Sequence, residues 1–238
     1  MPKTPVDGDH RFSRPLAESA APGVTCVVDV NVLSKYCITM SGSMVAQPIG
    51  YISELRRYVG RVREFERVDW QVYVGWVGLM LGLCCATGGF MLFGRAHGVV
   101  FPPVAWMVPI GALIFAAAVA VDTIGHRTIY KEEISRAEAL VHHVTIFCGV
   151  GSCVLLCAAY QHREALWVPA MVLTVMSFVY SLIDEAFHWV RYAAGRSDRI
   201  ETWSHMFIFV GHGTMMVGWW AHFFGGYVGV RETLGALL

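Results

Sequence analysis

The sequence has few charged residues for its length. Of its 238 residues, 15% are Asp, Glu, Lys or Arg and 55% are hydrophobic, whereas a soluble domain carries about 25% charged residues. Basic and acidic residues number 18 each, so there is no excess of positive charge for nucleic acid and no acidic tail. These proportions argue against a soluble enzyme or a nucleic-acid-binding protein and indicate an integral membrane protein.

The cysteines do not suggest a disulfide framework. They are seven, an odd number, and most lie in apolar runs, as expected for buried, reduced thiols. The first long apolar run begins near residue 70, so no cleavable signal peptide is expected.

Five apolar stretches are long enough to cross a hydrocarbon core, which takes about 20 residues in a helix. Since the backbone must satisfy its own hydrogen bonds in lipid, these stretches are expected to be helices. We therefore predict an all-α membrane protein: an N-terminal segment (1–68), a transmembrane domain (69–226) with spans near 71–93, 103–123, 139–160, 166–188 and 203–224, and a C-terminal tail (227–238).

Residues 50–68 have apolar residues at helical spacing among several arginines. This pattern predicts a basic amphipathic helix, lying either in the plane of the membrane surface or against the bundle or a partner as a linker helix. All basic residues except Arg95, Arg163 and Arg231, 15 of the 18, fall on one side of the expected spans. The positive-inside tendency places that side, and the N-terminus, in the cytoplasm.

An acid stands four residues before a histidine four times, where random placement predicts about one such pair. Spacing of four puts both side chains on one helix face, and up-and-down connectivity brings all four pairs to one side of the membrane. The pairs are Asp122–His126, Glu138–His142, Asp184–His188 and Glu201–His205.

Acids and imidazoles delivered by four helices to one level are typical of a metal site in a bundle core. The alternative is a set of solvated helix caps, which suits Glu138 and Glu201 at helix starts. It does not suit Asp122 and Asp184, because a negative charge at a helix C-terminus needs a compensating cation. From ligand types alone, a di-iron site is favoured.

The sequence Asp122-Thr-Ile-Gly-His126-Arg-Thr-Ile, followed by His143 with Phe147 four residues later, resembles the C subunit of the copper-dependent membrane monooxygenases that oxidise methane or ammonia. Asp184-Glu-Ala-Phe-His188 is similar to a later motif of that family, in which asparagine replaces the aspartate. His212 followed by Gly218-Trp219 resembles another. The resemblance covers residues 120–220.

The resemblance implies a copper site on Asp122, His126 and His143, which would be the catalytic residues, and a second copper position on Asp184, His188 and the shared His143. Four further residues would then orient the imidazoles or serve as alternate ligands, and His212 would accompany them: Glu138, His142, Glu201 and His205.

The family assembles its C subunit with A- and B-type subunits as a trimer of heterotrimers in a bacterial or archaeal inner or intracytoplasmic membrane, with an electron donor such as a quinol. The implied activity is oxidation of ammonia, methane or a short hydrocarbon by O2. Two other functions stay open: an integral-membrane di-iron hydroxylase or desaturase acting on lipid, and a membrane anchor that carries haem or metal for electron transfer.

Overall fold

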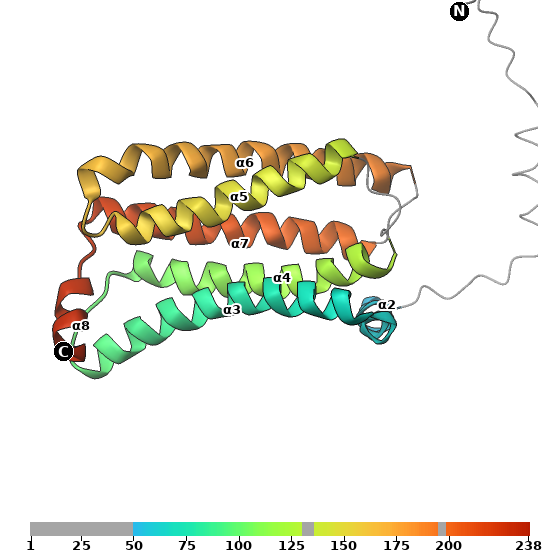
Figure 1. Ribbon diagram of the computed structural model, residues 1–238. Coiled ribbons are helices and arrows are strands. Elements are labelled where there is room, and N and C mark those ends of the chain that lie inside the picture. The colour runs from blue at the N-terminus through green and yellow to red at the C-terminus, as the bar shows by residue number, and fades with distance from the viewer. Residues whose placement is uncertain (1–49, 130–135, 195–198) are drawn as a thin grey trace, which may run out of the picture. The chain divides into compact units, whose positions relative to one another are not determined.

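The computed structural model describes residues 50–129, 136–194 and 199–238, so the expectations for residues 1–48 lie outside the described part. Most of the described residues are helical, with no β-strand among them. Figure 1 shows the order of elements along the chain: α2 (Tyr51–Gly60), the 3-10 helix η1 (Arg61–Glu64), α3 (Arg67–Ala96), the 3-10 helix η2 (Pro103–Trp106), α4 (Met107–Thr128), α5 (Arg136–Ala158), α6 (Arg163–Ala193), α7 (Arg199–Phe224) and α8 (Val230–Leu237).

Four helices are long and apolar enough to cross a membrane: α3, α4 together with η2, α5 and α6. These correspond to the first four expected spans. Helix α7 occupies the position of the fifth, but its polar residues, three histidines among them, leave it outside this group. Many of its side chains are buried by the other helices, which explains how it can carry polar groups.

Glycine brings α4 and α7 into very close contact along their lengths. A Cβ on Gly111 would meet backbone atoms of Met215 and Gly211, and a Cβ on Gly211 would lie 2.6 Å from the backbone nitrogen of Phe115. Small residues allow membrane helices to approach until their backbones touch. The α4–α7 pair is therefore the tightest part of the bundle.

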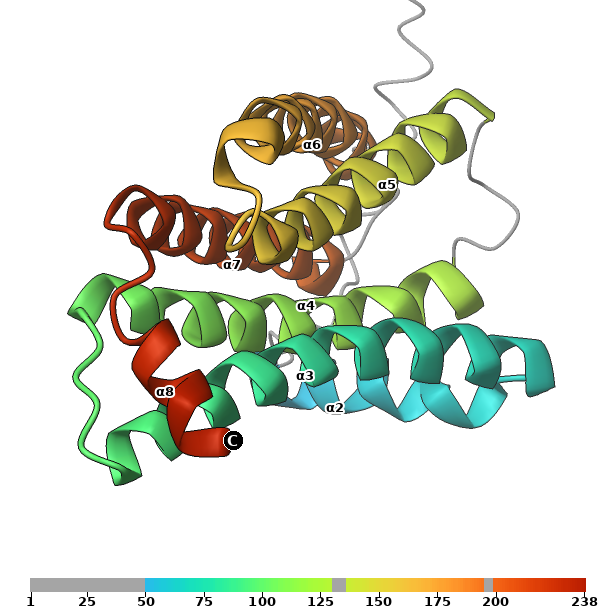
Figure 2. The same ribbon diagram turned by 60° about the vertical axis from the view of Figure 1, so that its left-hand side comes forward.

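The remaining helices pack in sequence order. Helix α5 packs along α6, and α3 along α4, so Figure 2 shows an α5–α6 pair on one side and an α3–α4 pair on the other, with α7 between them. The short helices α2 and α8 lie at opposite ends of the bundle (Figure 1).

Several helices extend beyond the expected spans, α6 for example over Arg163–Ala193 where 166–188 was expected. Two of the differences have a visible local cause. Helix α3 begins at Arg67, before the expected start at 71, because Glu66 and Asp69 form a capping box in which the Glu66 backbone N–H donates to Asp69 at 3.1 Å. The expected tail after residue 227 contains α8, which packs on α3 through the buried Thr233 beside Gly94. Both features are local hydrogen-bonding or packing effects that hydropathy does not report.

The glycine contact between α4 and α7 predicts a specific sensitivity. The substitution Gly111→Ala should lower the free energy of unfolding by about 1–3 kcal/mol, because the added methyl group meets backbone atoms that cannot move aside. The measurement is thermal unfolding of the purified protein in detergent. Gly75→Ala is the matched control, since its Cβ would have no neighbour within 4 Å; equal stability of the two variants would contradict the packing.

Candidate metal centre

Four helix ends meet at one end of the bundle. Helices α4 and α6 end there and α5 and α7 begin there, at the end of the bundle where Figure 1 labels α2. All four acid–histidine pairs lie on these helix ends. The up-and-down connectivity expected from the sequence therefore gathers them at one level.

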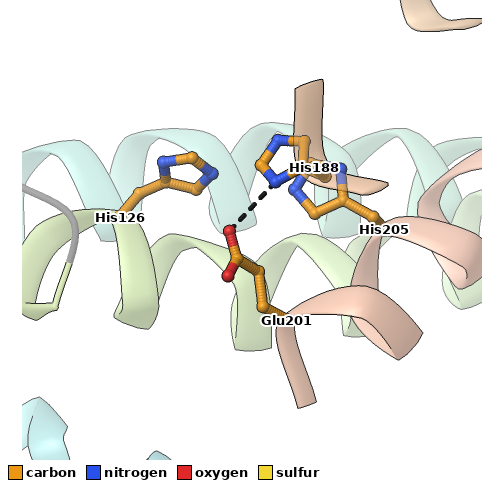
Figure 3. A group of neighbouring side chains, drawn as sticks. All are labelled: His126, His188, Glu201 and His205. Carbon is orange, nitrogen blue, oxygen red and sulfur yellow. Dashed lines mark hydrogen bonds and ion pairs between the residues drawn. The ribbon is translucent and has the colours of Figure 1, made fainter. Parts of the chain in front are cut away.

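Three histidines and one glutamate point toward one another in this region: His126 from α4, His188 from α6, and Glu201 and His205 from α7 (Figure 3). One nitrogen or oxygen of each lies within 4.8 Å of those of the others. The rings of His188 and His205 have centroids 3.4 Å apart. All but His126 are buried. We call these four residues the His3Glu group.

Glu201 orients His188. Its Oε1 lies 2.9 Å from Nδ1 of His188, the interaction dashed in Figure 3, while Nε2 of the same ring makes no hydrogen bond. Nη2 of Arg191, which can only donate, lies 2.9 Å from the same Nδ1, so Glu201 and Arg191 compete for this nitrogen. When Nδ1 carries the proton and donates it to Glu201, the Nε2 lone pair is left for another partner. A carboxylate holding one ring nitrogen while the other faces an ion is the usual arrangement of a metal-binding histidine.

His205 stands between two further carboxylates. Its Nε2 lies 2.9 Å from Oδ1 of Asp122 but is out of line for a hydrogen bond, and its Nδ1 lies 3.6 Å from Glu185. Asp122 also approaches His126, with Oδ2 3.5 Å from Nε2. Donor atoms that are close together without being aligned to each other are expected where they share a third partner.

Asp184 and His142 extend the group toward α5. Nδ1 of His142 lies 3.2 Å from Oδ2 of Asp184, and the His142 ring lies 5.5 Å from that of His126. The second oxygen of Asp184 makes no hydrogen bond and lies 4.0 Å from Nε2 of His188. This carboxylate therefore lies close enough to serve as a further ligand to an ion held by the His3Glu group.

The region contains more negative than positive charge. Arg191 is the guanidinium in contact with it, at 2.7 Å from Glu138 and 3.4 Å from Glu201, and it also lies against the His188 ring at 2.9 Å. Buried charges need a partner of opposite sign or a metal ion. Protons on the histidines or bound cations must therefore balance the carboxylates, which are Asp122, Glu138, Asp184, Glu185 and Glu201.

The structure places His142, and not His143, on the inner side of α5. His143 is exposed and its Nδ1 lies 2.5 Å from the carbonyl oxygen of Ala139 in its own helix, while Phe147 is 71% exposed on the same face. Consecutive helical residues point about 100° apart, so His142, four residues after Glu138, faces the core. His143, placed in both copper positions by the resemblance, is thus outside the group.

His212 lies two turns further along α7. Its ring stacks on Phe178 with centroids 4.5 Å apart, and its Nε2 lies 3.4 Å from Ser177. It lines a cavity of about 280 Å³ that has its polar end at the centre, beside Asp122 and His205. His212 is therefore a wall residue of this cavity and not part of the His3Glu group.

Two residues of the centre were not singled out in the sequence: Glu185 and Arg191. Arg191 follows Asp184 by seven residues and His188 by three, so helical periodicity places it on the same face. That spacing could have predicted that Arg191 faces the acid–histidine pairs, although an arginine near a helix end is usually solvated. Glu185 directly follows Asp184 and gave no periodic signal.

Comparison of the chain with protein-family models, with curated proteins and with solved structures finds no match. Function must therefore be inferred from the residues and geometry of this centre.

Removal of a central imidazole should remove the metal. His188→Ala should weaken binding of added copper or iron(II) by more than the roughly 10- to 100-fold that follows loss of an outer hydrogen-bond partner, as measured by metal analysis after equilibrium dialysis in detergent. His143→Ala removes an imidazole that faces outward and should leave the bound metal unchanged. Equal loss in both variants would show that the histidines bind metal non-specifically.

Arg191 should be needed for stability even before metal binds. Methionine approximates the length of the arginine side chain but carries no charge, so Arg191→Met leaves Glu138 and Glu201 without their buried cation. Leaving such charges uncompensated typically costs about 3–5 kcal/mol. Thermal unfolding of metal-free protein measures the loss. Arg199→Met, which breaks a pair with Glu54 in which the arginine is exposed, is the comparison and should cost less.

Proposed function

We propose that this chain is the metal-binding membrane subunit of a copper-dependent monooxygenase that uses O2 to oxidise a small substrate. The observation that carries the proposal is the His3Glu group, whose donor atoms lie within 4.8 Å of one another and of which His205 lines the polar end of an apolar cavity. A buried ligand set open to an apolar pocket is the arrangement that oxygen chemistry on a neutral substrate requires.

The donors fit copper. Three imidazoles suit both oxidation states of copper, and one carboxylate offsets part of the charge of the ion in a low-dielectric site. Asp122, His126, Asp184 and His188, which lie in or beside the group, are four of the five copper ligands that the resemblance implies. The fifth, His143, lies outside the group. Fit and resemblance point to the same part of the chain.

Copper bound here would supply the position at which O2 is reduced. In the balanced reaction, O2 and the substrate take up two electrons and two protons from a reductant such as a quinol, one oxygen atom enters a C–H or N–H bond, and the other leaves as water. The residues of the chain prepare this reaction: Glu201 fixes the His188 ring, Arg191 neutralises Glu138 and Glu201, and the apolar cavity walls exclude bulk water.

The carboxylates at the cavity end can carry the protons. Oε1 of Glu185 and Oδ1 of Asp184 make no hydrogen bond, and both residues line the cavity. A carboxylate at this place can accept a proton from the cytoplasmic side and pass it on without a change in the His3Glu group.

We also propose five membrane crossings, with α7 as the fifth and most enclosed, and an N-terminus in the cytoplasm. On this topology the metal centre lies near the cytoplasmic surface. Helix α2, in which Ile52 and Val59 are exposed, would lie in the plane of the membrane. A bacterial or archaeal inner membrane, and A- and B-type subunits in a trimer of heterotrimers, are proposed from the resemblance.

A second candidate is a di-iron hydroxylase. The observation that favours it is the number of carboxylates near the imidazoles: besides Glu201, Asp122 and Asp184 approach histidines of the group. Oxygen donors in this number favour iron over copper.

Metal identity and oxygen transfer test the proposal together. The protein, purified with its co-purifying subunits, should contain copper by mass spectrometry of the metals. When supplied with a quinol, it should incorporate one atom of ¹⁸O from ¹⁸O₂ into at least one of the added substrates, which are ammonia, methane, ethane and decane. His188→Ala and His205→Ala should lose both properties, because each removes an imidazole of the group.

The alternatives give different results. If the purified protein contains iron, shows no haem absorbance and still incorporates ¹⁸O, the di-iron hydroxylase replaces the copper monooxygenase as the function. A haem absorption band, or bound copper without any oxygen transfer, would contradict the proposed function.

A further inference from the structure

The cavity beside the metal centre is elongated along the helices. On α5 its wall runs from His142 to Cys157, roughly 22 Å at about 1.5 Å per residue, and on α7 from His205 to Met215, roughly 15 Å. The metal centre is at one end of this length. The cavity thus extends from the ligand level toward the middle of the bundle.

Beyond the metal end its walls are mainly apolar, although His212 and Ser181 contribute polar side chains. Aliphatic side chains from α3, α5 and α7, such as Leu83, Val150 and Ile208, form the body of the cavity. The hydroxyl groups of Thr123 and Thr145 in the wall donate to carbonyl oxygens of their own helices. Such a wall offers contact to an alkyl chain and little to a polar molecule.

The volume is much larger than methane or ammonia needs. The cavity measures about 280 Å³, whereas one water-sized molecule occupies about 30 Å³ of liquid and an apolar cavity of about 150 Å³ accommodates benzene. A molecule with a single heavy atom would leave most of the cavity empty. In proportion to benzene, which has six carbon atoms in about 150 Å³, an apolar segment of about ten carbon atoms would fill it.

Two wall residues are exposed on the outer surface of the bundle. Leu79 on α3 is 49% exposed and Val154 on α5 is 60% exposed, yet both line the cavity. Both helices are long and apolar enough to span a membrane. The cavity therefore opens sideways, at a depth where its surroundings are hydrocarbon.

We infer that the substrate is an alkyl segment of about ten carbon atoms that enters from the bilayer through this side opening and places its end beside Asp122 and His205. This inference rests on the proposed function. The reaction is then hydroxylation of the terminal carbon: a C–H bond is replaced by C–OH, the second oxygen atom of O2 becomes water, and a reductant of the quinol class supplies two electrons and two protons.

Gly149 gives a means to close the cavity. It lines the wall two turns, roughly 10 Å, beyond His142, and a Cβ added there would have no neighbour within 4 Å. Gly149→Leu should fill the body of the cavity and leave the metal end open. Gly82→Leu is the matched control, because Gly82 is exposed on α3, has equal space and does not line the cavity.

Photolabelling in phospholipid nanodiscs tests the occupant without any turnover. One arm uses a ten-carbon alkane with a diazirine at mid-chain, and the other a phospholipid with the same group in a ten-carbon acyl chain. Labelled sites are found by mass spectrometry. The expected result is labelling of α5 and α7 at cavity-wall residues such as Val150 and Ile208, about tenfold lower in Gly149→Leu and unchanged in Gly82→Leu.

Whichever arm labels the wall identifies the source of the chain, a free hydrocarbon or a lipid. Labelling restricted to outward-facing residues, or equally strong in Gly149→Leu, would overturn the inference. In the active enzyme, Gly149→Leu should lower oxidation of decane about tenfold relative to ethane; an unchanged ratio would also overturn it.

Metal content separates this failure from failure of the proposed function. If the protein contains the metal and transfers oxygen but its cavity wall is not labelled, only the inference of an alkyl substrate fails. If the protein contains neither copper nor iron, the proposed function fails, and with it the role of the cavity as a substrate site.

Discussion

Compensation of buried charge is the constraint on which the rest of this structure depends. Five carboxylates and four histidines lie at one end of a bundle whose other surfaces are largely apolar, with Arg191 in contact with Glu138 and Glu201. Each of these groups would be unfavourable alone in a low-dielectric environment. They are tolerable only as a set, so their helices must end at the same level and face the same interior.

That constraint made much of the arrangement predictable. Acid and histidine at a spacing of four predicted shared helix faces, and alternation of the spans predicted a common side of the membrane. Both inferences need only helical geometry and chain direction. The helical class and the first four membrane-length helices followed from hydropathy for the same reason, since long apolar runs have few alternative structures.

The other features of the site depend on how the helices pack against one another, which cannot be read from a single sequence. Which of His142 and His143 faces inward is decided by the rotation of α5, and one residue changes that rotation by about 100°. The placement of Arg191 depends on the contact between α5, α6 and α7. The low hydropathy of α7 is explained by its enclosure, which becomes visible only when its neighbours are in place.

The division of the helices into pairs has a consequence for the synthesis of the protein. His126 belongs to the α3–α4 pair and His188 to the α5–α6 pair, whereas Glu201 and His205 belong to α7, which is translated after both. Glycine-mediated contact with α4 fixes the position of α7. The His3Glu group is thus incomplete until α7 has been synthesised and has packed between the two earlier helix pairs, so an ion that needs all four residues could bind only after that step.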